Sequence, residues 1–232
     1  MLKYPCLVLD HDDTIVQSEA TVNYPCFCRY LEQFRPGATM SLADYVNACN
    51  KMPFIDMCKS YFNLTDEEMY QEYLFWKAYT QSHIPATYPG ISDFLHTYRN
   101  AGGIICVVSM SSEANILRDY RYHFDLIPDR IFGCDLPEEQ QKPSPWAIEQ
   151  ICSQYGFKPE EILVIDDMKF AVKMARDAGS PIAFAGWGRK DFPEICSEMA
   201  CLCDFSFVSI EELQSFLFEE DKNEAGARSY LC

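Results

Sequence analysis

The chain begins with a short apolar run that leads directly into an acidic turn. The run spans residues 6–9, and the turn that follows reads Asp10, His11, Asp12, Asp13 and Thr14. Strands with one face in water alternate apolar and polar residues, so an unbroken apolar run is typical of a strand covered on both faces in a parallel sheet. Ligands bind at the carboxyl ends of such strands. We therefore expect a buried first strand that ends in functional carboxylates, with a solvated acidic turn as the alternative.

Beyond residue 90 the chain alternates strand-like and helix-like segments. The expected strands are short apolar runs at residues 104–108, 131–132, 162–165, 182–185 and 205–208. The segments between them place apolar residues at helical spacing, as Phe94, Leu95 and Tyr98 do. Strands that alternate with helices of this length form a parallel sheet with right-handed crossovers. The sequence therefore predicts an α/β fold, with a Rossmann-like parallel sheet flanked by helices.

Residues 15–88 interrupt this alternation with helical signals and no convincing strand. Ser41 precedes one apolar helical pattern, and Thr65 with Glu68 forms a capping box ahead of another. We predict an all-helical cap domain at residues 15–88, inserted into a core made of residues 1–14 and 89–218, with a flexible tail at 219–232. The alternative is that these helices simply flank the sheet. Helical spacing assigns most of the aromatic residues of this segment to its own core rather than to a roof over a substrate.

The charge of the chain limits the partners that it can bind. Its 232 residues have a formal net charge of −16, and no basic cluster is visible. This balance argues against nucleic acid and against an anionic membrane surface. No apolar stretch approaches the roughly 18 residues of a membrane span. Polar or helix-breaking residues also come too early for a signal peptide, at Lys3, Pro5 and Asp10.

Twelve cysteines raise the possibilities of a disulfide framework or a zinc site. Cys6, Cys106 and Cys152 lie inside apolar runs, however, where cysteine acts as a small buried hydrophobic residue in a reducing compartment. No histidine near the closely spaced cysteine pairs completes a zinc ligand set. We therefore expect a cytoplasmic protein. We also expect it to be a monomer or a weak homodimer.

Polar residues also follow the other expected strands. Ser109 follows the run at 104–108, Lys142 stands before Pro143 beyond the third strand, and Asp166 with Asp167 ends the fourth. Because parallel strands bring these ends to one edge of the sheet, carboxylates, a hydroxyl and an ammonium group are expected in one crevice. This set suits Mg²⁺-assisted phosphoryl transfer. A phospho-acceptor signalling domain has a similar sheet, but it is much shorter and lacks a helical insertion.

In their order and context these residues resemble the four motifs of the haloacid dehalogenase-like (HAD) hydrolase superfamily. The acidic turn resembles the first motif, Asp-x-Asp-Gly-Thr, and Ser109 resembles the second. Lys142 with Pro143 resembles the third motif, and Asp166 with Asp167 resembles the fourth. The match spans about residues 5 to 215. The helical insertion resembles the C1 cap of the phosphoglycolate phosphatase and β-phosphoglucomutase branch.

The resemblance implies a Mg²⁺-dependent phosphatase that acts on a small phosphorylated metabolite. Asp10 is then the nucleophile that forms an aspartyl phosphate, and Asp12 is the general acid and base. The resemblance places the metal ion at Asp10, Asp167 and Asp166, with the backbone carbonyl of Asp12 as a further ligand. Asp12 also favours a phosphate ester or anhydride, because relatives that cleave carbon–halogen or carbon–phosphorus bonds lack an acid at that position.

The phosphate itself is expected to contact three residues. By the same resemblance, Ser109 donates a hydrogen bond to a phosphoryl oxygen, and the backbone N–H of Met110 or Ser111 assists it. Lys142 neutralises the phosphate and pairs with the nucleophile. His11 and Arg189 are further candidates for substrate contacts.

Two residues depart from the family pattern. Asp13 stands where the first motif usually has glycine, and Ala171 stands where the fourth motif commonly has a further aspartate. Two alternatives to a phosphatase stay open, a phosphomutase and a catalytically weak regulatory protein that keeps the fold. The insertion has few basic residues, and none lies in a context that resembles a mutase.

Overall fold

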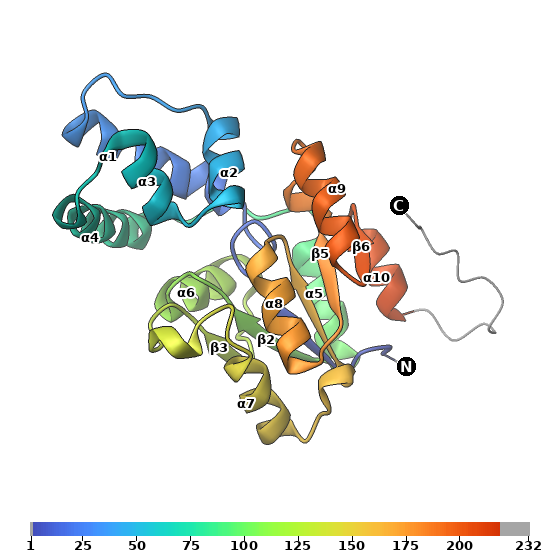
Figure 1. Cartoon of the computed structure of the whole chain (residues 1–232). Coiled ribbons are helices and arrows are strands. Elements are labelled where there is room, and N and C mark those ends of the chain that lie inside the picture. The colour runs from blue at the N-terminus through green and yellow to red at the C-terminus, as the bar shows by residue number, and fades with distance from the viewer. Residues whose placement is uncertain (1, 219–232) are drawn as a thin grey trace. The chain divides into compact units, whose positions relative to one another are not determined.

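The α/β core of the protein is a six-stranded parallel sheet. A computed structural model describes residues 2–218, so the predicted tail at 219–232 lies outside the described residues. The strands lie in the order β3-β2-β1-β4-β5-β6, and every neighbouring pair is parallel (Figure 1). Their bounds are Cys6–Leu9 for β1, Ile104–Val108 for β2, Arg130–Phe132 for β3, Ile162–Asp166 for β4, Ile182–Ala185 for β5 and Phe205–Phe207 for β6. The predicted fold class is confirmed.

Helices cover the sheet on both faces, which is why its central strands are apolar except for Asp166 at the end of β4. Every residue of β1, β4 and β5 is buried. On one face α8 packs against both α7 and α9. In another part of the core, α10 packs against α5. The core helices span Ile91–Asn100 (α5), Glu113–Phe124 (α6), Trp146–Tyr155 (α7), Lys169–Ala178 (α8), Pro193–Leu202 (α9) and Ile210–Phe218 (α10). The strand order reverses between β1 and β4, and open α/β sheets bind their ligands at such a point.

Val16–Tyr88 forms a second compact unit, separate from the unit that holds the residues up to Ile15 and those from Pro89 onward. Its α-helices are α1 (Tyr24–Phe34), α2 (Leu42–Lys51), α3 (Phe54–Phe62) and α4 (Asp66–Ser82), preceded by a π-helical turn, η1 (Glu19–Asn23). Its two ends are joined by an antiparallel bridge between Val16 and Thr87. The predicted role of this unit as a cap stays a prediction.

The predicted helix starts in this unit follow from side-chain capping. Ser41 accepts a hydrogen bond from the backbone N–H of Asp44 at 3.1 Å, and Thr65 accepts one from the N–H of Glu68 at 3.3 Å. The Glu68 carboxylate in turn accepts a hydrogen bond from the Thr65 N–H at 2.9 Å, which completes the capping box. In the core, α7 begins at Trp146, with Pro145 at its N-cap position.

The aromatic residues of the second unit are buried less completely than helical spacing predicted. Tyr45 and Phe62 lie in its core, but Tyr61, Tyr70 and Tyr73 expose 56%, 57% and 44% of their surface. The prediction assigned most of the aromatic residues of this segment to its core, and these three tyrosines are exceptions to it. For Tyr70 and Tyr73 the reason is that α4 carries aromatic residues around most of its circumference, so one neighbouring layer of helices cannot cover them all.

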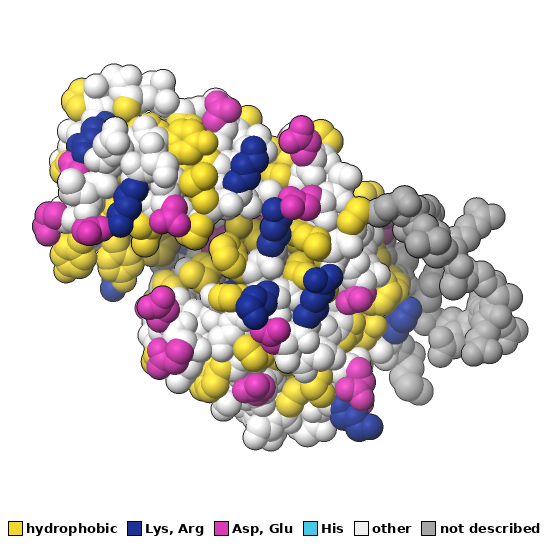
Figure 2. Space-filling view, viewed as in Figure 1, with side chains coloured by type: hydrophobic (Ala, Val, Ile, Leu, Met, Phe, Trp, Pro, Cys, Tyr) yellow, Lys and Arg dark blue, Asp and Glu magenta, His cyan; other side chains and the backbone are white. Residues whose placement is uncertain are grey.

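The surface carries basic side chains that are interleaved with acidic ones. Figure 2 shows this mixture on the face that it presents. On α8, Lys169 lies 2.6 Å from Glu198 and Lys173 lies 2.5 Å from Asp177. Of the helices within residues 2–218, none combines the length and the apolar character that crossing a membrane requires. The described cysteines are all free thiols.

Candidate active site

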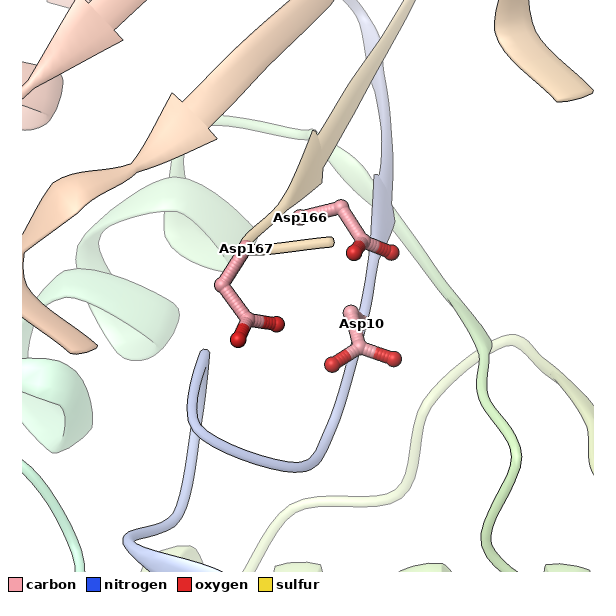
Figure 3. Close-up of side chains that lie close together, drawn as sticks. All are labelled: Asp10, Asp166 and Asp167. Carbon is pink, nitrogen blue, oxygen red and sulfur yellow. The ribbon is translucent and has the colours of Figure 1, made fainter. Parts of the chain in front are cut away.

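Three carboxylates meet at the carboxyl ends of β1 and β4. Asp10 directly follows β1, Asp166 is the last residue of β4, and Asp167 comes next (Figure 3). One ligand oxygen from each lies within 4.8 Å of the others. The three residues expose only 7%, 1% and 1% of their surface. The structure thus brings together the three side chains that were predicted as metal ligands.

Lys142 reaches this cluster from the loop before α7. Its ammonium nitrogen lies 2.7 Å from Oδ1 of Asp10 and 2.5 Å from Oδ2 of Asp166. Burial alone would lower the pKa of Lys142, but the two carboxylates raise it above its usual value, so the side chain stays charged. The predicted pairing of this lysine with the candidate nucleophile is present.

The carboxylates themselves are short of positive charge. Burial raises the pKa of Asp10 well above its usual value; Lys142 opposes this shift, and Asp166 and Asp167 add to it. The pKa of Asp166 is raised in the same way by burial and by Asp167, against Lys142. Such shifts show that the ionised cluster is unfavourable with one ammonium group alone. An all-oxygen donor set of this charge fits a hard divalent cation.

Asp12 lies beside two serine hydroxyls. Its Oδ2 accepts a hydrogen bond from Ser111 Oγ at 2.6 Å and one from Ser109 Oγ at 3.3 Å. The Ser111 N–H, predicted to assist phosphate binding, donates to Ser109 Oγ at 3.1 Å instead. The sequence prediction missed the contact between the Ser111 side chain and Asp12, although the run of serines after β2 was a signal. The predicted phosphate contact of the Met110 N–H stays a prediction.

Asp13 and Arg189 form an ion pair next to the cluster. Nη1 of Arg189 lies 2.8 Å from Oδ2 of Asp13, and Nη2 lies 2.5 Å from Oδ2 of Asp167. Arg189 exposes only 6% of its surface. It was predicted as a substrate contact, but the structure buries it among carboxylates of the protein.

His11 is also buried, with 1% of its surface exposed. Its Nε2 lies 3.1 Å from Oδ2 of Asp119, and its ring stacks on Tyr120. The structure therefore places His11 in the core between β1 and α6. The substrate contact that was predicted for it stays a prediction. Ala171 is buried in α8, and its methyl side chain has no atom that could act as a ligand beside the carboxylate cluster.

With this geometry in place, comparisons with known proteins identify the family. Residues 7–185 match the sequence model for haloacid dehalogenase-like hydrolases. The phosphoglycolate phosphatase of Mannheimia succiniciproducens is 25% identical over 123 residues, which cover 50% of this chain and 54% of that protein. Phosphoglycolate phosphatase 1 of Pseudomonas aeruginosa is 30% identical over 135 residues, 56% of this chain and 48% of that protein. These matches cover about half the length of each relative.

A solved structure shows that the fold is shared over almost the whole chain. A HAD family hydrolase from Deinococcus radiodurans, crystallised with bound phosphate and sodium, superposes with a TM-score of 0.71 at 16% identity. The superposition covers 94% of this chain and 96% of that one. Because the family model matches most of the sequence and the sheet carries its motifs at the strand ends, the chain belongs to the haloacid dehalogenase-like hydrolase family.

Proposed function

We propose that this protein is a Mg²⁺-dependent phosphatase that hydrolyses a small phosphorylated metabolite through an aspartyl phosphate. The observation that supports it best is the buried contact of Lys142 with both Asp10 and Asp166. A carboxylate nucleophile for a phosphate ester needs nearby positive charge, because nucleophile and substrate are both anions. The names of the two curated relatives support the same reaction class.

In the proposed first step, an oxygen of ionised Asp10 attacks phosphorus, and the bond from phosphorus to the ester oxygen breaks. The Lys142 ammonium opposes the effect of burial on the pKa of Asp10 and so favours the ionised nucleophile. Asp12 gives its proton to the leaving alkoxide. The hydroxyls of Ser109 and Ser111 hold the Asp12 carboxylate at 3.3 Å and 2.6 Å and so restrict its orientation.

In the second step, Asp12 takes a proton from a water molecule, which attacks the aspartyl phosphate and releases inorganic phosphate. Asp10 is regenerated as a carboxylate. Asp10, Asp166 and Asp167 are the residues that would hold Mg²⁺, because their oxygens meet within 4.8 Å. When bound, the ion supplies positive charge to the phosphoryl oxygens and to the buried carboxylates.

The second unit, Val16–Tyr88, is proposed to act as the cap that selects the substrate. The net charge of −16 argues against nucleic acid and anionic membranes as partners. The free thiols of the described cysteines support a reducing compartment, in keeping with a cytoplasmic location. We propose a monomer or a weak homodimer.

Hydrolysis of p-nitrophenyl phosphate by the purified chain tests this proposal. Activity should require Mg²⁺, disappear on chelation with EDTA and return when Mg²⁺ is added. Asp10→Asn should abolish it, because the amide oxygen is not a nucleophile, while Asp93→Asn, which changes an exposed aspartate on α5, should retain it. Retained activity in Asp10→Asn would contradict the assignment of the nucleophile. A panel of phosphorylated sugars, nucleotides and organic acids would then identify the substrate.

A further inference from the structure

Arg189 joins two turns of the candidate site through buried charges. Its guanidinium contacts Asp13, in the turn after β1, at 2.8 Å, and Asp167, in the turn after β4, at 2.5 Å. The side chains of Asp13, Arg189 and Asp167 expose only 6%, 8% and 1% of their surface. None of the four family motifs contains Arg189, and the proposed reaction does not use it.

From this geometry we infer that Arg189, anchored by Asp13, is a positioning residue that fixes the Asp167 carboxylate for metal binding. The inference rests on the metal site of the proposed function. The planar guanidinium presents Nη1 to one carboxylate and Nη2 to the other in a fixed fork, whereas a lysine offers a single ammonium nitrogen without such fixed directions. Thr14 Oγ1 lies 3.5 Å from the other oxygen of Asp167, so the turn after β1 contacts both oxygens of this carboxylate, directly or through Arg189.

The backbone at Asp13 supports this assignment. Asp13 has a φ of 52°, in the left-handed region that favours glycine, the residue that the family pattern has there. Aspartate tolerates this conformation better than most residues but less well than glycine. The buried ion pair with Arg189 offsets that disadvantage, and glycine, which has no side chain, could not form it.

The segment that carries Arg189 is itself attached to the turn after β1. Arg189 directly follows the short helical turn η4 (Gly186–Gly188) after β5. In that turn Trp187 donates from Nε1 to the backbone carbonyl of Thr14 at 2.9 Å, and it is buried. The Arg189 backbone also donates to the Gly186 carbonyl at 3.1 Å. The guanidinium thus projects from a base that is tied to the same turn whose aspartate it binds.

The alternative is that Arg189 acts only through its charge. The two roles predict different effects on Mg²⁺ binding. A guanidinium near the metal site repels the cation, so removing the charge alone would tighten Mg²⁺ binding. A positioning role predicts the reverse, because groups that orient metal ligands typically contribute about 10–100-fold to metal affinity.

Arg189→Lys separates the two roles, because it keeps the charge and removes the fixed fork of Nη1 and Nη2 that contacts Asp13 and Asp167. We expect its dissociation constant for Mg²⁺, measured by isothermal titration calorimetry on the full chain, to rise by about tenfold. The activity on p-nitrophenyl phosphate should show a higher requirement for Mg²⁺ but a nearly normal kcat at saturating Mg²⁺. Arg99→Lys is the matched control, since Arg99 pairs with Asp129 at 2.9 Å in the same unit and far along the chain from the cluster. It should leave Mg²⁺ binding unchanged.

Asp13→Gly tests the anchor in a variant whose backbone suits the site. It should also weaken Mg²⁺ binding, and the double variant Asp13→Gly, Arg189→Lys should bind Mg²⁺ no more weakly than the weaker single variant, because both changes break the same bridge. The inference would be overturned if the dissociation constant for Mg²⁺ were unchanged or lower in both single variants. It would also be overturned if the wild-type chain bound no Mg²⁺. Calorimetry needs no turnover, so a chain that binds Mg²⁺ but hydrolyses no phosphate ester would refute the proposed function alone.

Discussion

Glu72 is a buried carboxylate in the second unit, and its replacement gives a quantitative test of the structure. It lies on α4 with 6% of its surface exposed, and no lysine or arginine of the described residues forms a salt bridge with it. Burial raises the pKa of Glu72 from 4.5 to about 7. Between these values the folded protein holds a proton that the unfolded chain has lost, so stability falls as the pH rises through this window.

The size of the effect follows from the two pKa values. A difference between 4.5 and about 7, at roughly 1.4 kcal/mol for each pH unit, corresponds to about 3 kcal/mol above the folded pKa. Glutamine has the same shape and no charge at any pH. We expect the stability of Glu72→Gln relative to the wild type to increase by about 2 kcal/mol between pH 5.5 and pH 8.5.

Urea unfolding followed by circular dichroism at both pH values measures this difference. The buried amide carries its own cost, but that cost is the same at every pH, so the widening of the gap with pH is the test. Glu67→Gln changes an exposed glutamate on the same helix and should show no such widening. A gap for Glu72→Gln that stays constant between the two pH values would refute the reasoning.

Two further substitutions test the candidate site. Lys142→Met leaves Asp10 and Asp166 buried without their ammonium partner, so we expect a loss of about 3–5 kcal/mol in unfolding free energy, partly restored by millimolar Mg²⁺, together with loss of phosphatase activity. Urea titration with and without Mg²⁺ checks this, and unaltered stability would contradict the ion-pair argument. Ser111→Ala removes the 2.6 Å hydrogen bond to Asp12, which for a charged acceptor is worth roughly 1.5–3 kcal/mol. Its kcat for p-nitrophenyl phosphate should fall about tenfold or more, and a normal kcat would mean that Ser111 does not orient the acid.

The sequence was sufficient to predict the sheet and the carboxylate cluster because both follow from local patterns. An unbroken apolar run such as residues 6–9 can be buried only between two layers, and parallel strands then align their polar ends. Asp10 and Asp166 are far apart in the chain but occupy equivalent places at strand ends, and Lys142 lies between β3 and α7, so their meeting could be inferred. The exposure of Tyr70 and Tyr73 could not, because it depends on which helices reach α4.

The positions of Arg189 and His11 were also beyond a reading of the sequence. His11 closely follows β1 and Arg189 follows the short turn after β5, and in both places a contact with the substrate is as reasonable as a buried contact with an aspartate of the protein. Only the three-dimensional arrangement shows that Asp119 on α6 lies within 3.1 Å of His11 and that two aspartates flank Arg189. A polar or charged residue near a strand end therefore indicates the region of the site. Whether it contacts the substrate or an aspartate of the protein depends on how deeply it is buried.

The charge balance of the site explains why an extra acid in the first motif is compatible with the proposed reaction. Asp10, Asp166 and Asp167 face one buried ammonium group, that of Lys142, which leaves a formal excess of two negative charges for a divalent cation. Asp13 adds one negative charge and Arg189 adds one positive charge, so this pair leaves that excess unchanged. The departure from glycine therefore need not alter the electrostatic demand for the metal ion. The effect of Asp13 is mechanical, since through Arg189 it ties the turn after β1 to the carboxylate of Asp167. For this reason Arg189→Lys, which keeps the charge, is the decisive variant.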